Sequence, residues 1–155
     1  LIFKGRREMT EKNILVPLDF SDINKALVRK ADEWAIRTGA KLFFLHVVPD
    51  LTYRFIDPKV ENVFHTNDDI ITDEIREDME KFVSDQQVTA PHEHLVLEGK
   101  PYTQIIKAQK DHAIDLIIIA AHDHTVVGRL FVGSNTDYIL HHVHCPVYVY
   151  KEAAS

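Results

Sequence analysis

The sequence predicts an α/β domain with a doubly wound, five-stranded and mostly parallel sheet that carries helices on both faces. Short continuous apolar runs, typical of strands covered on both faces, alternate along the chain with segments of helical periodicity. Parallel neighbours need crossover connections, which such helices supply. With 155 residues, 45% of them hydrophobic and 27% charged, the chain has the size and composition of one ordinary globular domain.

The first half of the chain is expected to hold two strands and two helices. Residues 13–19 form the first strand, where Pro17 marks a bulge or the strand's end because proline lacks an N–H to donate. Ser21 caps the first helix, and Thr38 and Gly39 end it, since glycine adopts the left-handed conformation readily. The next segments are a strand at 41–48, a connection without clear periodicity at 51–67, and a helix at about 68–87 with an acidic outer face.

The second half continues the alternation. Its elements are a strand at 94–98, a helix from Pro101, a strand at 116–120, a helix capped by Ser134, and a strand at 146–150. Proline is favoured at the first position of a helix, and Ile105, Ile106 and Ala108 are expected to face inward from there. If the last strand lies at the sheet edge, its unpaired backbone groups favour a homodimer built through Val147, Tyr148 and Val149.

Charge and composition exclude some functions. The net charge is −6, with 18 Lys+Arg against 24 Asp+Glu, so nucleic acid is not an expected partner. No apolar run approaches the roughly 20 residues that cross a bilayer, so no membrane partner is expected either. The single cysteine, Cys145, suits a reducing cytoplasm, where we expect the protein. Met9 is a candidate native start, so we expect one domain at 9–155 and a cloning remnant or disordered extension at 1–8.

The most informative stretch runs from Asp115 to Tyr150. An apolar strand ends in polar residues, a loop follows, and Gly133 and Ser134 then open a helix. This arrangement offers backbone N–H groups and the positive end of a helix to an anion. As a helix N-cap, however, Ser134 needs no ligand to explain it.

Several segments together resemble the universal stress protein family. They are residues 13–22, Leu45-His46-Val47, Gly99-Lys100-Pro101, residues 115–119, Gly133-Ser134 and Cys145-Pro146-Val147. The resemblance covers about residues 11–150 and implies the doubly wound fold, a homodimer and, in members that bind ATP, an adenine-nucleotide site. Carried over to this chain, the site would comprise Pro17, Asp19, Val47, Ala120, His122, Asp123, Gly133, Ser134 and Asn135.

The chain departs from the family pattern in the phosphate loop. Members that bind ATP have Gly-x-x-Gly, nine residues, then Gly-Ser or Gly-Thr; here Ala120 and Asp123 replace the first two glycines. Two unit charges about 4 Å apart repel by roughly 4 kcal/mol at an effective dielectric of 20, near three decades of affinity. We therefore expect weak or absent ATP binding, unless Asp123 turns outward or a divalent cation bridges it to the phosphates.

The role of Asp19 stays open between two alternatives. Asp19 either holds a ribose or adenine group or accepts backbone N–H groups in the turn before the first helix. His46, at a buried strand end, is expected to be a hydrogen-bonded core residue. Ser134 has no identifiable base, Cys145 precedes a proline at the start of a buried strand, and no carboxylate pair is placed for acid–base work, so no catalytic residue is assigned.

Three functional hypotheses follow. The first is a non-catalytic, homodimeric stress-response regulator with a degenerate nucleotide loop and an unidentified protein partner. The second is a protein that binds ATP or another adenine nucleotide, with gated signalling or slow hydrolysis. The third is a metal-binding module that uses His122, Asp123 and His124, although the histidine spacing is poor for three or four converging ligands.

Overall fold

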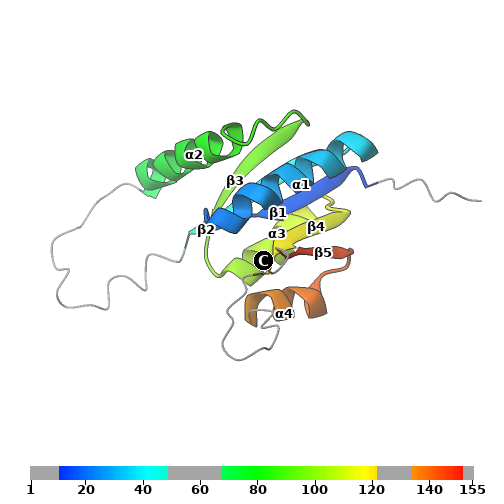
Figure 1. Cartoon of the computed structure of the whole chain (residues 1–155). Helices are drawn as coiled ribbons and strands as arrows, with labels where there is room; N and C mark the ends of the chain where they lie inside the picture. Colours follow the sequence, from blue (N-terminus) through cyan, green and yellow to red (C-terminus); the bar gives the residue numbers. More distant parts are fainter. Residues whose placement is uncertain (1–10, 49–67, 122–133, 152–155) are drawn as a thin grey trace, which may run out of the picture.

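The computed structural model describes residues 11–48, 68–121 and 134–151. In chain order the elements are β1 (Asn13–Pro17), α1 (Asp22–Thr38), β2 (Lys41–Val48), α2 (Asp68–Ser84), β3 (His92–Glu98), α3 (Pro101–Asp111), β4 (Leu116–Ala120), α4 (Ser134–His142) and β5 (Val147–Tyr150). The strands form one sheet in the order β3-β2-β1-β4-β5, and every neighbouring pair is parallel (Figure 1). The predicted fold class is confirmed.

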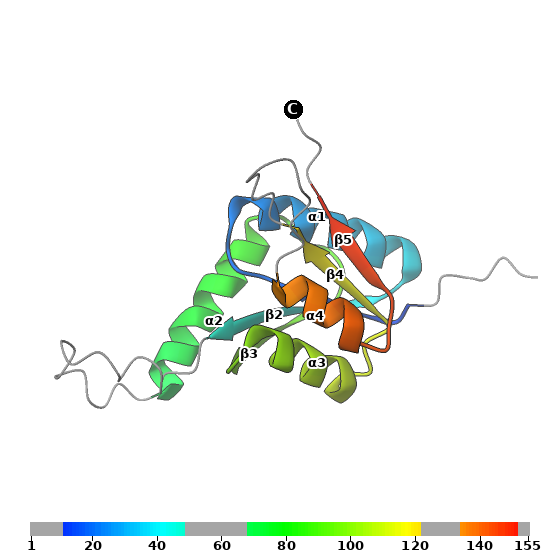
Figure 2. The same ribbon diagram turned by 90° about the horizontal axis from the view of Figure 1, so that it is seen from below.

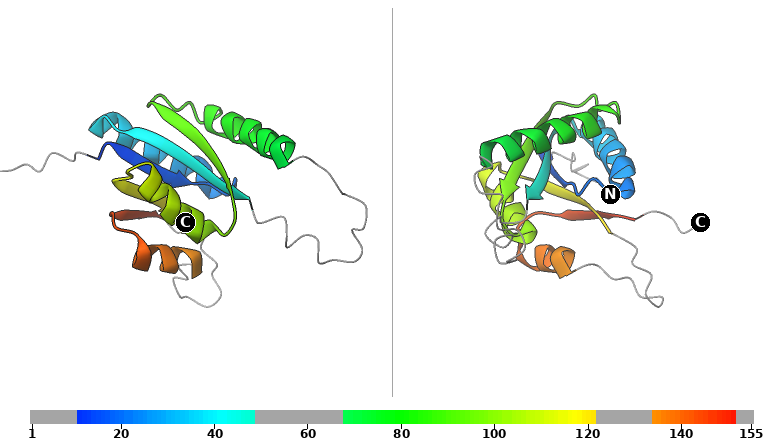
Figure 3. Two further views of the ribbon diagram at one scale, coloured as in Figure 1. Left: turned by 180° about the vertical axis from the view of Figure 1, so that it is seen from behind. Right: turned by 90° about the vertical axis from the view of Figure 1, so that its left-hand side faces the viewer.

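The helices cover the sheet in two layers (Figures 2 and 3). One face packs against α1 and α2 and the other against α3 and α4. Alternation along β1 shows why both faces need cover: Ile14 and Val16 point to the α1–α2 side, Leu15 points to the α3–α4 side, and none of the three has exposed surface.

The order of the strands creates a crevice. From β1 the chain winds outward through β2 to β3, then returns to β4 on the other side of β1 and continues to β5. The strand order therefore reverses between β1 and β4, and the carboxyl ends of the strands at such a point are the usual place for a ligand in an open α/β sheet.

Hydrogen bonds at the opposite end of the sheet hold β1 and β4 together. The Oδ2 atom of Asp115 accepts the backbone N–H groups of Lys12 (2.9 Å) and Asn13 (3.0 Å). The Nδ2 atom of Asn13 donates to the carbonyl oxygen of His112 at 3.1 Å. These bonds join residues about a hundred positions apart and fix the register of the two strands that flank the crevice.

Some predicted boundaries were wrong. β1 ends at Pro17, two residues before the predicted end; of the two explanations for this proline, the strand's end is correct. β3 begins at His92 rather than at 94, because the pairing with β2 extends to this residue. α2 ends at Ser84 rather than near 87, and Gln87 has a left-handed backbone (φ 59°).

Other details of the helices were also corrected. Ile106 is only half-buried, whereas Ile105 and Ala108 are buried as predicted. Ser21 occupies the N-cap position of α1, but its side chain makes no cap hydrogen bond. α4 begins at Ser134, close to the predicted start, but the Ser134 side chain and the predicted connection at 51–67 lie outside the described residues.

Candidate functional site

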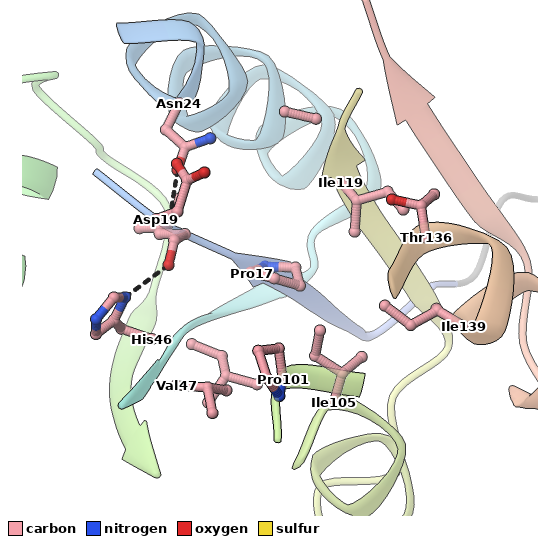
Figure 4. Close-up of a pocket in the computed structure, with 13 residues that line it drawn as sticks. Pro17, Asp19, Asn24, His46, Val47, Pro101, Ile105, Ile119, Thr136 and Ile139 are labelled. Carbon is pink, nitrogen blue, oxygen red and sulfur yellow. Dashed lines mark hydrogen bonds between the residues drawn. The ribbon is translucent and has the colours of Figure 1, made fainter. Parts of the chain in front are cut away.

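A pocket of about 220 Å³ opens at the crevice (Figure 4). Its lining comes from the carboxyl ends of β1, β2 and β4, from the turn after β1, and from α1, α3 and α4: Pro17, Leu18, Asp19, Asn24, Leu45, His46, Val47, Pro101, Ile105, Ile119, Ala120, Thr136 and Ile139. Mostly apolar walls with a few polar groups are typical of a small-molecule site. The volume is below the roughly 300 Å³ at which drug-sized sites begin, so the pocket suits part of a nucleotide better than a whole one.

The turn between β1 and α1 presents Asp19 at the polar side of the pocket. The backbone N–H of Asp19 donates to Oδ1 of Asn24 at 2.7 Å, and Asn24 is buried with 2% exposure. The Oδ1 atom of Asp19 accepts both the backbone N–H of Ser21 (3.0 Å) and its hydroxyl (2.6 Å). The carboxylate therefore does accept a turn N–H, as one of the two open readings held, and it also lines the pocket.

Phe20, the next residue, has a left-handed backbone with φ of 63°. This conformation is costly for a bulky side chain and persists only where packing over-determines it. Here the ring packs on His46, with centroids 4.5 Å apart, and edge-on to Phe82 of α2 at 5.6 Å. Phe20 therefore connects the turn at the pocket to α2, which covers the same face of the sheet as α1.

His46 supports the same turn from β2. Its Nδ1 atom donates to the carbonyl oxygen of Leu18 at 2.8 Å (Figure 4). Because a carbonyl oxygen only accepts, this bond places the proton of neutral His46 on Nδ1. The expectation of a hydrogen-bonded residue is confirmed, although the side chain is half-buried rather than buried.

The structure brings four of the predicted site residues together. Pro17, Asp19, Val47 and Ala120 all line the pocket. The backbones of Ser134 and Asn135 begin α4, and their neighbour Thr136 also lines the pocket, but their own side chains lie outside the described residues. His122, Asp123 and Gly133 lie wholly outside them.

Sequence reasoning missed Asn24, although a signal was present. Asn24 falls on the helical stripe that is completed by Leu27, Val28, Ala31 and Ala35, all buried in α1. A polar residue in a buried stripe requires a hydrogen-bond partner, and the turn just before the helix is the nearest source of one. Nothing comparable in the sequence indicated that Thr136 would line the pocket.

The described residues offer little for covalent or metal chemistry. Burial raises the pKa of the Cys145 thiol to about 11, so this group stays protonated at neutral pH and is a poor nucleophile. Among residues 11–48, 68–121 and 134–151, no group of three or more His, Cys, Asp and Glu could hold a metal ion. The proposed ligands His122, Asp123 and His124 lie outside this range. No helix in the described part is long and apolar enough to span a membrane.

Comparison with known proteins gives a consistent result. Residues 11–151 match the sequence model of the universal stress protein family. Universal stress protein MJ0577 of Methanocaldococcus jannaschii is 23% identical over 157 aligned residues, which cover 93% of this chain and 97% of that protein. The solved structure of MJ0577 superposes with a TM-score of 0.74, at 24% identity and with 94% and 99% of the two chains covered.

Two further solved structures are similar. Universal stress protein UspA from Lactobacillus plantarum has a TM-score of 0.65 at 28% identity, with 90% of this chain and 97% of that chain covered. A universal stress protein from Archaeoglobus fulgidus in complex with dAMP has a TM-score of 0.61 at 21% identity, with 91% and 98% covered. At that identity the second likeness concerns the fold alone.

Proposed function

This chain belongs to the universal stress protein family, and on that premise we propose that it is a non-catalytic stress-response regulator whose pocket binds an adenine nucleoside monophosphate more tightly than ATP. The observation that carries the proposal is the pocket at the carboxyl ends of β1, β2 and β4. It combines apolar walls with one carboxylate, and its volume of about 220 Å³ suits a base and ribose.

The lining supports this choice of ligand. Val47, Ile105 and Ile119 supply apolar surface for a flat base, and Asp19 supplies an acceptor for a ribose hydroxyl or an amino group. Thr136 brings the first turn of α4 to the same pocket, and the positive end of a helix favours an anion such as a single phosphate. The A. fulgidus relative solved with dAMP has the same fold.

The preference over ATP rests on the loop sequence. Asp123 stands where the family pattern has glycine, and its like charge opposes a polyphosphate more strongly than a monophosphate. Ala120, which lines the pocket, adds a methyl group in place of the other glycine. The alternative is a protein that binds ATP, with nucleotide-gated signalling or slow hydrolysis, and titration with the same nucleotides distinguishes it from the proposed function.

The test is a thermal shift and calorimetric titration with AMP, dAMP and Mg-ATP. A ligand at 100 times its Kd stabilises by about 2.7 kcal/mol, which raises the midpoint by roughly 5–10 °C for a chain of this size. We expect such a shift with AMP and a smaller one with Mg-ATP at equal concentration. Stronger binding of Mg-ATP would favour the alternative, and no binding of any of the three would contradict the proposal.

A pair of variants locates the binding. Val47→Phe fills the pocket, whereas Val143→Phe introduces the same ring in place of another half-buried valine on the α3–α4 side, outside the pocket. We expect Val47→Phe to abolish the AMP response and Val143→Phe to keep it. Equal responses from the two variants would place the ligand elsewhere.

We also propose that two copies pair through β5. β5 is an outer strand of the sheet, as the predicted dimer requires. The carbonyl groups of Pro146 and Tyr150 accept bonds from β4, so by alternation the N–H and C=O groups of Val147 and Val149 point away from the sheet. An unpaired row of this kind is a template for a second strand.

Proline substitution tests this dimer. Val149→Pro removes one outward N–H and leaves the bonds to β4 intact, and proline is tolerated at such edge positions. We expect light scattering to show a dimer for the unsubstituted chain and a folded monomer for Val149→Pro. A monomeric unsubstituted chain, or a dimeric Val149→Pro, would contradict the proposal.

A further inference from the structure

Two histidines of β3 lie under α2, on the sheet face that carries Phe44. The rings of His92 and His94 have centroids 5.2 Å apart, and they lie 5.7 Å and 6.1 Å from the fully buried ring of Phe44. The Nε2 atom of His94 is buried and has no hydrogen-bond partner among the described residues. Whichever nitrogen carries the proton of the neutral ring, the protonated ring has a buried N–H at Nε2 with no acceptor and a charge, which costs free energy.

The charges around His94 come from two elements. Arg76 of α2 donates from Nη1 to the carbonyl oxygen of His94 at 3.0 Å, and Glu80 of α2 and His92 of β3 complete the set. Burial and the charge of His92 lower the pKa of His94 from its usual 6.5; Glu80 acts in the opposite direction, and Arg76 lowers it further. His46, which lies on β2, differs from His94 because its ring does have an acceptor: its Nδ1 atom donates to the carbonyl oxygen of Leu18.

α2 connects this pair to the pocket. Met79 and Val83 anchor the helix in the core, and Phe82, on the same helix, meets Phe20 at 5.6 Å. Phe20 is the left-handed residue next to Asp19, so its conformation depends on packing that His46 and α2 supply together. Weaker docking of α2 would leave the turn that carries Asp19 with less support.

We propose that proton uptake by His94 regulates the pocket, by weakening the docking of α2 and, through Phe82 and Phe20, the turn that presents Asp19. This inference rests on the proposed function, because it concerns the same site. Neutral His94 favours the docked helix and the binding-competent turn. Acidification lowers the competent fraction, and the apparent affinity for the ligand falls with it. By linkage, the bound ligand must in turn oppose protonation of His94.

The test compares AMP affinity at pH 7.5 and pH 5.5 by calorimetry. His94→Phe keeps a ring on Phe44 and removes the titration. His112→Phe is the matched control, since this imidazole also packs on a phenylalanine of β2, with centroids 5.0 Å apart, but lies at the end of α3. The AMP phosphate titrates near pH 6, but this contribution is common to all three proteins.

We expect the affinity of the unsubstituted chain and of His112→Phe to fall at least about fivefold more than that of His94→Phe between the two pH values. An NMR titration of the His94 ring needs no variant, and saturating AMP should move its midpoint to lower pH. No binding of AMP at pH 7.5 would refute the proposed function, and the coupling with it. Binding at pH 7.5 with equal pH dependence in all three proteins, or an unmoved His94 midpoint, would refute the coupling alone.

Discussion

Replacing Asn24 by leucine tests how the turn that presents Asp19 is held. The substitution keeps a side chain of similar size and removes the acceptor of the 2.7 Å bond from the Asp19 N–H. Asn24 is only 2% exposed and its bond to the Asp19 N–H is part-buried, so water replaces the lost partner only in part. A donor left unsatisfied in such a place costs about 1–3 kcal/mol.

The expected result is a loss of stability together with a loss of affinity. For a chain of this size, about 2 kcal/mol corresponds to a midpoint lower by roughly 4–8 °C, which calorimetry measures directly. AMP affinity should fall as well, because Asp19 would no longer be held at the pocket.

Ser21→Ala provides the contrast. Its hydroxyl donates to Asp19 at 2.6 Å in an exposed position and makes no cap bond to α1, so we expect a loss of less than about 1 kcal/mol. The reasoning would be refuted if Asn24→Leu were as stable as the unsubstituted chain, or if Ser21→Ala were the more destabilised of the two.

The double variant Ala120→Gly, Asp123→Gly should strengthen Mg-ATP binding by up to about three decades in calorimetry; an unchanged affinity would mean that the loop does not limit binding. Gly99→Ala should destabilise by at least about 1 kcal/mol in urea unfolding, because Gly99 has φ of 135° and an added Cβ would meet Nε2 of Gln104 at 2.8 Å; full stability would contradict this. The lowered pKa of His94 means that the unfolded chain binds more protons near and below pH 6.5, so stability should be complete above that pH and decline as the pH falls. His94→Phe should flatten this decline, and an equally steep decline would exclude His94 as its source.

The elements were predictable because their signals are local. Apolar runs identified the interiors of all five strands, and helical spacing identified the helices between them. The start of β3 was missed because His92 and Glu93 are polar or charged, yet both pair with β2. A strand that carries such residues lacks the apolar pattern by which strands are recognised.

The candidate site was predictable in part. Pro17, Asp19, Val47 and Ala120 were assigned by family resemblance, and they converge because parallel strands place their carboxyl ends at one edge. The metal hypothesis and the loop residues His122, Asp123 and Gly133 remain predictions, since they lie outside the described residues.

By itself, the sequence determined the alternation of strands and helices, because periodicity is a property of short segments, and the family resemblance supplied four residues of the crevice. Only the tertiary structure decided that Phe20 is left-handed against Phe82, and that His94 lies under α2 beside Arg76. Phe20 and Phe82 are 62 positions apart in the chain, and a contact of that kind arises only once the helices have packed on the sheet.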